Sequence, residues 1–256
     1  MNKENSKTII EVKNLTIGYD GCILLNDLDF AIKKGEIFII LGGSGCGKST
    51  VLKHLIGLYE PLSGDIIING KSIVNSTEAE KSALCREFGV LYQSGALFSS
   101  LTLQENVSVS LREFTNLSEN MIHSIAKLKL SLVGLSGYEN FFPSEISGGM
   151  KKRAGLARAL ALDPEILFFD EPSAGLDPIS SAELDRLILE LRDTLGCTMI
   201  IVSHELDSIF SIADNTIMLD KEKKGIIERG NPKYLKENSK NELVKEFLNR
   251  SNMRGL

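Results

Sequence analysis

Short continuous apolar runs alternate along the chain with stretches whose apolar residues recur at helical spacing. The runs at residues 37–41, 166–169 and 197–202 are typical of strands that are buried on both faces. Residues 183–195 carry an apolar stripe at helical spacing, and Gly196 follows as a stop signal. Strand, helix and strand in this order predict an α/β fold with a parallel sheet and right-handed crossovers.

Two other patterns flank this α/β core. Residues 8–17 and 23–30 show partial alternation of apolar and polar positions, and an apolar run at 64–71 contains an Asn69-Gly70 turn. These segments predict an N-terminal antiparallel β subdomain. From about residue 94 to 154 the strand-like runs vanish and amphipathic stretches appear, which predicts a helical lobe inserted into the core.

The chain turns polar and helical beyond about Gly230. We therefore expect a main domain at 8–235 and a C-terminal helical tail at 236–256. Residues 242–248 form an amphipathic segment within that tail. Three placements are open for it: against the core, against a partner, or as a solvated helix.

A glycine-rich segment follows the apolar run at 37–41 and fits the pattern G-x-x-x-x-G-K-[ST]. Its glycines let the backbone curl and aim N–H groups at phosphate oxygens, and the next helix adds its N-terminus. Lys48 would supply a charge to the β- and γ-phosphates, and Ser49 a hydroxyl to Mg²⁺. An ordinary glycine-rich turn is disfavoured because a strand and a helix flank the motif. The expected nucleotide-binding residues here are Gly42, Gly43, Ser44, Gly45, Cys46, Gly47, Lys48, Ser49 and Thr50.

Two further stretches suit a triphosphate. Asp170 ends a buried strand, where it would hold Mg²⁺ through water, and Glu171 would polarise the water that attacks the γ-phosphate. Alone, the pair would equally fit two surface acids after a strand. Ser147, Gly148 and Gly149 place a hydroxyl and two unhindered N–H groups at the start of an amphipathic helix. This is a second helix N-terminus able to bind an anion.

Composition and net charge restrict the classes of partner that this protein is expected to bind. The 256 residues are 43% hydrophobic and 25% charged, as expected of a domain that buries a core. The net charge of −5 gives no support to a nucleic-acid partner. The polar start at 1–5 differs from a signal peptide, and no apolar run has the length of a membrane span. Membrane association is therefore expected only through partners. The four cysteines lack metal-ligand spacing, which predicts reduced thiols.

In their order along the chain, the motifs resemble those of an ATP-binding-cassette (ABC) transporter ATPase, over about residues 8–235. The resemblance implies a P-loop NTPase fold, with ATP as substrate and Mg²⁺ as cofactor. It also implies a head-to-tail homodimer, in which Ser147, Gly148 and Gly149 of one subunit complete the ATP site around the other subunit's phosphate loop. The matching segments are Gly42–Ser49, Gln93, Ile146–Met150, Phe169–Glu171, Ala174–Asp177 and His204.

The resemblance also implies roles for single residues. Tyr19 would stack on adenine, although a surface tyrosine of a hairpin is the alternative. Gln93 would sense Mg²⁺ and the attacking water, and His204 would sense the γ-phosphate, although a lone histidine is more often structural. Asp177 would contact the partner subunit. The expected catalytic residues are thus Glu171, His204 and Gln93, and the expected metal ligands are Ser49, Gln93 and Asp170.

One departure narrows the subfamily, because Ile146 and Met150 replace the first and last residues of the usual Leu-Ser-Gly-Gly-Gln pattern. Together with residues 93–98 and 111–113, this looks like the ATPase of the Mla (maintenance of lipid asymmetry) type of phospholipid transporter. The resemblance implies integral membrane permease subunits, an MCE-domain lipid-binding subunit and a STAS-domain protein as partners. It places the chain at the cytoplasmic face of the inner membrane, as a peripheral protein held by the permease.

Three alternatives remain. The ATPase of a small-solute importer, for example for amino acids, shares the mechanism, but Met150 and residues 94–98 disfavour it. A soluble cassette ATPase that acts on nucleic acid or ribosomes would usually carry tandem cassettes or a long coiled-coil insertion. A non-hydrolysing regulatory cassette would be expected to lack Lys48, Glu171 or His204, all of which are present.

Overall fold

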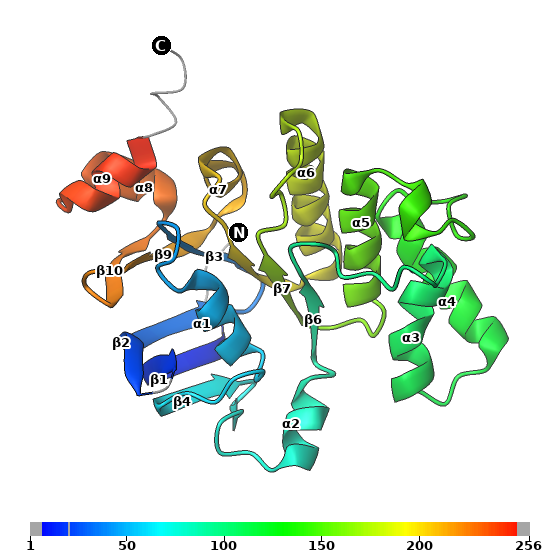
Figure 1. The fold of residues 1–256 in the computed structure, drawn as a ribbon, viewed down its shortest axis with the longest axis horizontal. Coiled ribbons are helices and arrows are strands. Elements are labelled where there is room, and N and C mark those ends of the chain that lie inside the picture. The colour runs from blue at the N-terminus through cyan, green and yellow to red at the C-terminus, as the bar shows by residue number, and fades with distance from the viewer. Residues whose placement is uncertain (1–6, 20, 250–256) are drawn as a thin grey trace.

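In residues 7–19 and 21–249, which this computed structural model describes, two β-sheets are surrounded by helices (Figure 1). The strands are β1 (Thr8–Tyr19), β2 (Cys22–Lys33), β3 (Ile37–Gly42), β4 (Ser63–Ile68), β5 (Lys71–Ser72), β6 (Phe88–Leu91), β7 (Ile166–Asp170), β8 (Thr198–Val202), β9 (Asn215–Asp220) and β10 (Gly225–Gly230). The helices are α1 (Lys48–Leu55), α2 (Glu78–Leu84), α3 (Leu103–Phe114), α4 (Glu119–Leu132), α5 (Gly148–Ala159), α6 (Pro178–Leu195), α7 (Leu206–Ile212), α8 (Pro232–Asn238) and α9 (Glu242–Asn249), with a 3₁₀ turn at Pro143–Glu145.

The larger sheet has six strands in the order β10-β9-β3-β8-β7-β6. The strands from β9 to β6 pair in parallel, and β10 is antiparallel at the edge. One face of the sheet packs on α5 and α6, and the other packs on α1 and the smaller sheet. Both faces are covered, which explains the continuous apolar runs of β3, β7 and β8. The predicted parallel sheet is confirmed, and β9 and β10 extend it beyond the strands that the sequence indicated.

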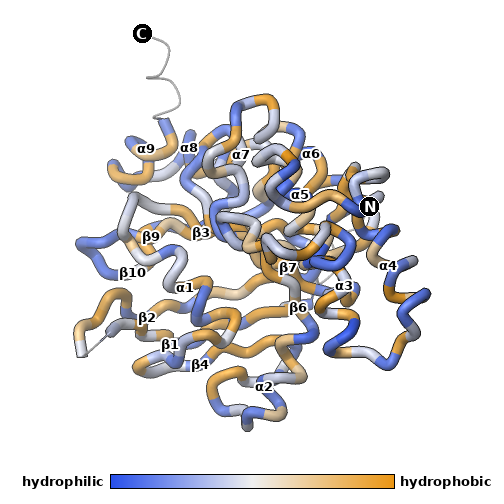
Figure 2. The backbone as a smooth tube through the Cα atoms, turned by 45° about the vertical axis from the view of Figure 1, so that its right-hand side comes forward, coloured by the Kyte–Doolittle hydropathy of each residue, from blue (hydrophilic) through white to orange (hydrophobic). Residues whose placement is uncertain are grey.

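The smaller sheet has the order β2-β1-β4-β5, and its strands pair antiparallel. Asn69 and Gly70 join β4 to β5 with φ angles of 50° and 78°, the left-handed backbone that a tight hairpin requires. Helix α1 lies between the two sheets, where Val51, Leu52 and Leu55 are buried in one apolar cluster with both. Figure 2 shows hydrophobic segments following the strands of both sheets. The predicted antiparallel subdomain is confirmed.

Helices α3 and α4 pack on each other and on α5, and form the predicted helical lobe. Its apolar side chains are buried in the same cluster as one face of the larger sheet, among them Val107, Ile122 and Leu130. In Figure 1 the lobe, drawn in green, lies at the right, on the opposite side of the molecule from β1 and β2. Helix α5 therefore connects the lobe to the larger sheet, where it packs against β6.

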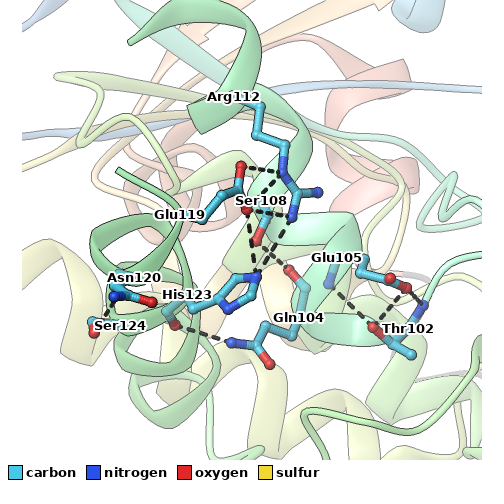
Figure 3. A network of polar contacts seen from close by, with 9 residues as sticks. All are labelled: Thr102, Gln104, Glu105, Ser108, Arg112, Glu119, Asn120, His123 and Ser124. Atoms are coloured by element: carbon cyan, nitrogen blue, oxygen red, sulfur yellow. Dashed lines mark hydrogen bonds and ion pairs between the residues drawn. The ribbon is translucent and has the colours of Figure 1, made fainter. Parts of the chain in front are cut away.

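An ion pair joins the two outer helices of this lobe (Figure 3). Arg112 of α3 donates from Nη2 to Glu119 Oε2 of α4 at 2.9 Å and from Nε to Oε1 at 3.1 Å. This bond lowers the pKa of Glu119 from its usual value. Gln104 adds a bond from its Nε2 to the carbonyl of His123 at 3.1 Å. The pair is exposed and contributes little to stability, and its two bonds link the end of α3 to the start of α4.

The C-terminal helices pack on the core. Val244, Phe247 and Leu248 of α9 are buried in the same cluster as one face of the larger sheet. The solvated-helix alternative for residues 242–248 is therefore wrong. Residues 250–256 of the predicted tail lie outside the described residues. Within the described part of the chain, no helix combines the length and the apolar character needed to cross a bilayer.

A single buried amide organises the entry to the lobe. Asn106 of α3 is fully buried, and its Oδ1 accepts from the N–H of Phe98 at 2.7 Å. Its Nδ2 donates to the carbonyls of Phe98 at 3.1 Å and Leu101 at 3.0 Å. One side chain thus satisfies both backbone groups of Phe98 and fixes the loop that precedes α3, where buried backbone groups must be paired.

We predict that Asn106→Ala lowers the free energy of unfolding by about 3 kcal/mol, because it removes a fully buried side chain and leaves the N–H of Phe98 and the carbonyl of Leu101 without their partner. Ser108→Ala on the same helix is the matched control. Ser108 is equally buried, but its Oγ only bonds back to the carbonyl of Gln104 at 2.8 Å. Urea unfolding would measure both variants. If both variants lost the same free energy of unfolding, the hydrogen bonds of Asn106 would contribute no more to stability than the single bond of Ser108.

Candidate nucleotide-binding site

The loop between β3 and α1 wraps its own lysine. Lys48 is 7% exposed, and its ammonium donates to the carbonyls of Gly42 at 3.0 Å and Gly43 at 3.1 Å. Gly47 precedes α1 with φ 102°, which favours glycine. A Cβ on Gly42 would lie 2.5 Å from the carbonyl oxygen of Leu219, so only glycine fits beside β9. The loop thus curls around one cation at the N-terminus of α1, an arrangement that suits an anion.

Ser49 and Asp170 meet across the sheet. Ser49 Oγ donates to Asp170 Oδ1 at 2.8 Å, although β8 separates β3 from β7. Val202 of β8 pairs with Ile40 of β3 on one side and with Asp170 of β7 on the other. Strands β3 and β7 therefore end at the same edge of the sheet. A hydroxyl and a carboxylate side by side are oxygen donors of the kind that Mg²⁺ takes, so these residues fit that cofactor.

Glu171 and His204 form the next pair. His204 Nδ1 lies 2.7 Å from Glu171 Oε2. That oxygen is buried, and within the described residues the contact with His204 is the polar interaction found for it. Glu171 has φ 48°, a left-handed backbone that costs a non-glycine residue about 1–3 kcal/mol and is concentrated at functional sites. The left-handed backbone and the buried carboxylate paired with His204 make Glu171 a candidate for a functional role.

Tyr19 lies at the end of β1 with half of its surface exposed. Its hydroxyl contacts Thr50 Oγ1 at 3.4 Å, so the ring stands beside the start of α1. Tyr59 meets it edge-on with ring centroids 5.9 Å apart, and Lys53 lies over the Tyr59 ring. The sequence analysis missed Tyr59. Its position four residues after α1 was the only available signal, and a loop tyrosine has no periodicity that marks a role.

The second predicted cluster forms where α5 and α6 begin. Ser147 caps α5 and accepts from the N–H of Met150 at 3.2 Å, and a Cβ on Gly149 would lie 3.8 Å from Ser180 of α6. Asp177 caps α6 by accepting from the N–H groups of Ile179 and Ser180, both at 3.0 Å. The structure thus brings Ser147, Gly148, Gly149 and Asp177 together.

The two clusters form at different helix starts, one at α1 and the other at α5 and α6. In the described residues, no hydrogen bond or ion pair connects Ser147, Gly148 or Gly149 to residues 42–50. Gln93 follows β6, and its carbonyl accepts from the ammonium of Lys152 on α5.

The side chain of Cys46 lies in the core beneath the loop. The side chain is 2% exposed, and burial raises the pKa of its thiol. The thiol thus stays protonated and faces the core, while the N–H of residue 46 remains part of the loop.

A parallel α/β sheet with a lysine-bearing phosphate loop and acidic residues at the ends of neighbouring strands defines a P-loop nucleotide-binding protein. The family model described as ABC transporter matches residues 25–174. The chain belongs to the ABC transporter family, and it is the ATP-binding part of such a transporter.

Several relatives match over most of this chain. It is 41% identical to the intermembrane phospholipid transport system ATP-binding protein MlaF of Haemophilus influenzae, over 90% of this chain and 86% of the relative. Identity to MlaF of Escherichia coli K12 is 35%, over 96% and 90%. The chain is 44% identical to the probable ribonucleotide transport ATP-binding protein mkl of Mycobacterium tuberculosis, over 94% of this chain. It spans 66% of the length of that relative.

Solved structures agree with this assignment. The cassette MJ0796, in a dimeric post-hydrolysis state bound to ADP and Pi, superposes with a TM-score of 0.79 at 27% identity, over 87% of this chain and 98% of that one. The protein cbiO1 from Clostridium perfringens, part of the ABC transporter complex cbiONQ, gives 0.83 at 31% identity, over 97% and 96%.

A buried carboxyl lies behind the segment that carries His204. Asp185 of α6 is 8% exposed and is hydrogen-bonded to Ser208 of α7. Desolvation raises its pKa from 3.8 to about 6, although the bond from Ser208 opposes the rise. The negative charges of Glu205 and Asp207 raise it further. The folded protein thus holds this proton more tightly than the unfolded chain does.

Because the folded pKa is the higher one, ionisation of Asp185 costs stability as the pH rises from about 4 through about 6. We predict that Asp185→Asn raises the free energy of unfolding by about 2 kcal/mol at pH 8 and changes it little at pH 4. Glu190→Gln, an exposed carboxylate of the same helix, is the control. Denaturant unfolding at the two pH values would decide. A gain of equal size at both would contradict the titration of Asp185.

Proposed function

We propose that this chain hydrolyses ATP to power an ABC transporter that moves phospholipid between the inner and outer membranes. The proposal of ATP hydrolysis rests on one cluster of residues at the ends of β3, β7 and β8. It combines Lys48 in its loop, the Ser49–Asp170 bond at 2.8 Å and the Glu171–His204 contact at 2.7 Å. These are the groups that triphosphate hydrolysis needs: a phosphate cradle, metal ligands and a base.

In this mechanism Lys48 leaves its carbonyl partners for the β- and γ-phosphates, whose charge it neutralises. Ser49 and Asp170, with Gln93, hold Mg²⁺, which would offset the charge on the phosphate oxygens. Glu171 takes the proton of the attacking water. His204 touches Glu171 now and would orient the γ-phosphate and that water when ATP is bound. Tyr19, whose ring meets Tyr59 edge-on, would stack on adenine.

The presence of two clusters, each at the start of a different helix, supports a head-to-tail homodimer. Ser147, Gly148 and Gly149 present a helix N-terminus to solvent beside Asp177 and would meet the triphosphate of the partner subunit. The dimeric state of the cassette MJ0796 supports the same arrangement for this chain. Each ATP would lie between Lys48 of one subunit and Ser147 of the other.

The names of the MlaF relatives support phospholipid as the cargo. The implied partners are integral permease subunits, an MCE-domain lipid-binding subunit and a STAS-domain protein. The chain would then sit at the cytoplasmic face of the inner membrane, held by the permease through the helical lobe. The mkl relatives, at 44% identity, favour a second candidate, ribonucleotide transport. Both candidates use the same hydrolytic site.

We predict that Glu171→Gln binds ATP with near-normal affinity, accumulates as a dimer and loses at least about 100-fold in turnover, because the amide cannot accept the proton. Calorimetry, light scattering and phosphate release measure the three quantities. Glu190→Gln is the control for loss of a carboxylate elsewhere. Steady hydrolysis by Glu171→Gln would remove Glu171 from its role as base.

For the cargo, the chain should be purified from membranes with its permease and reconstituted in vesicles. We expect phospholipid to raise ATP hydrolysis several-fold and labelled phospholipid to move in an ATP-dependent manner, with no response to ribonucleotides. The Glu171→Gln complex should show neither effect. Stimulation and uptake with ribonucleotides in place of lipid would favour the second candidate.

A further inference from the structure

A buried lysine links three functional segments of one chain. Lys152 lies on α5, five residues after Ser147, and is 6% exposed. Its ammonium donates to the carbonyl of Gln93 and, at 3.4 Å, to the carbonyl of Glu171. Both acceptors are backbone groups of residues placed in the catalytic site. The same helix begins with the residues expected to serve the partner's ATP.

The position of this charge needs an explanation, because burial disfavours an ammonium. Desolvation lowers the pKa of Lys152, whereas the carboxylates of Glu205, Glu171 and Asp170 raise it. In the described residues no carboxylate lies within ion-pair distance of its ammonium. The buried ammonium of Lys152 bonds two backbone carbonyls. An apolar residue of the same length would fill the same space without the free-energy cost of desolvating a charge.

The loop after Gln93 is held on the same helix. Arg158 of α5 donates to the carbonyls of Gly95 at 3.2 Å and Ala96 at 2.5 Å. A Cβ on Gly155 would lie 2.9 Å from the Gly95 carbonyl oxygen, so the loop and the helix touch backbone to backbone. The loop from Gln93 to Ala96 therefore cannot shift far without α5.

Glu171 is held just as tightly. Its N–H donates to the carbonyl of Val202 at 2.9 Å, and its own carbonyl accepts from the N–H of Ala174 at 3.1 Å and from Lys152. These bonds fix a residue whose φ of 48° is strained. The bond from Lys152 is the contact that ties this residue to α5.

We propose that Lys152 is a positioning residue that couples the start of α5 to Gln93 and Glu171 of the same chain. When the partner's nucleotide binds at Ser147 and α5 moves, the ammonium moves the carbonyls that place the two catalytic side chains. ATP bound in one site thereby sets the catalytic geometry of the other. The inference rests on the proposed function, since it concerns turnover at two sites shared by two copies.

The test compares two substitutions of nearly equal length. Lys152→Met keeps the apolar packing and removes the donor, whereas Lys152→Gln keeps an N–H donor without the charge. Lys151→Met is the matched control, because Lys151 is adjacent and only half-buried, and no ion pair or hydrogen bond of its ammonium occurs within the described residues. For each purified full chain, calorimetry gives the ADP dissociation constant, and phosphate release gives kcat, KM and the Hill coefficient for ATP.

For Lys152→Met we expect kcat to fall about 10- to 100-fold, as a small misplacement of catalytic groups does. The ADP dissociation constant should stay within about 2-fold, and the Hill coefficient should fall toward 1. Lys152→Gln should recover part of kcat, and Lys151→Met should resemble the wild type.

Two results would overturn this role. One is a kcat of Lys152→Met within about 2-fold of the wild type. Another is a loss of ADP affinity as large as the loss of kcat, which would make the lysine merely structural. If Lys152→Met does not fold, Lys152→Gln decides by the same measures. An inactive wild type would instead reject ATP hydrolysis, the proposed function itself.

Discussion

The pairing of β8 with β3 on one side and β7 on the other is the constraint on which the site depends. Val202 is level with both Ile40 and Asp170, so the outer strands end together, about 10 Å apart. That spacing lets Ser49, at the start of α1, reach Asp170, and lets His204, after β8, reach Glu171. Parallel strands place such residues at one edge, which is where open α/β sheets bind their ligands.

In the proposed dimer, this sheet presents half of each ATP site. The ends of β3 and β7 bring together Lys48, Ser49, Asp170 and Glu171, whereas Ser147 begins another helix, α5. Helix α5 belongs to both halves, because it begins at Ser147 and holds Gln93 and Glu171 through Lys152. The helical lobe packs on this helix as well. In the proposed dimer, nucleotide, partner subunit and lobe would all contact α5, and coupling between them would require this helix to have two positions.

Much of the fold and site could be predicted from the sequence because the informative signals are local. Continuous apolar runs gave β3, β7 and β8, and spacing within short motifs gave the loop at 42–50 and the Asp170–Glu171 pair. Strand β9 and the edge strand β10 were missed, since their patterns lack clear periodicity. The placement of α9 depended on contacts with distant elements. Tyr59 and Lys152 were missed because their roles arise from neighbours far away in sequence, which no local pattern encodes.

The central claim is that each triphosphate is held by two copies of the chain. A structure of the wild-type protein with Mg²⁺ and a non-hydrolysable ATP analogue tests it most directly. The account predicts a two-fold dimer with the γ-phosphate between Lys48 of one subunit and Ser147 of its partner. A nucleotide held entirely within one chain, with Ser147 of every neighbouring copy remote from it, would contradict the account.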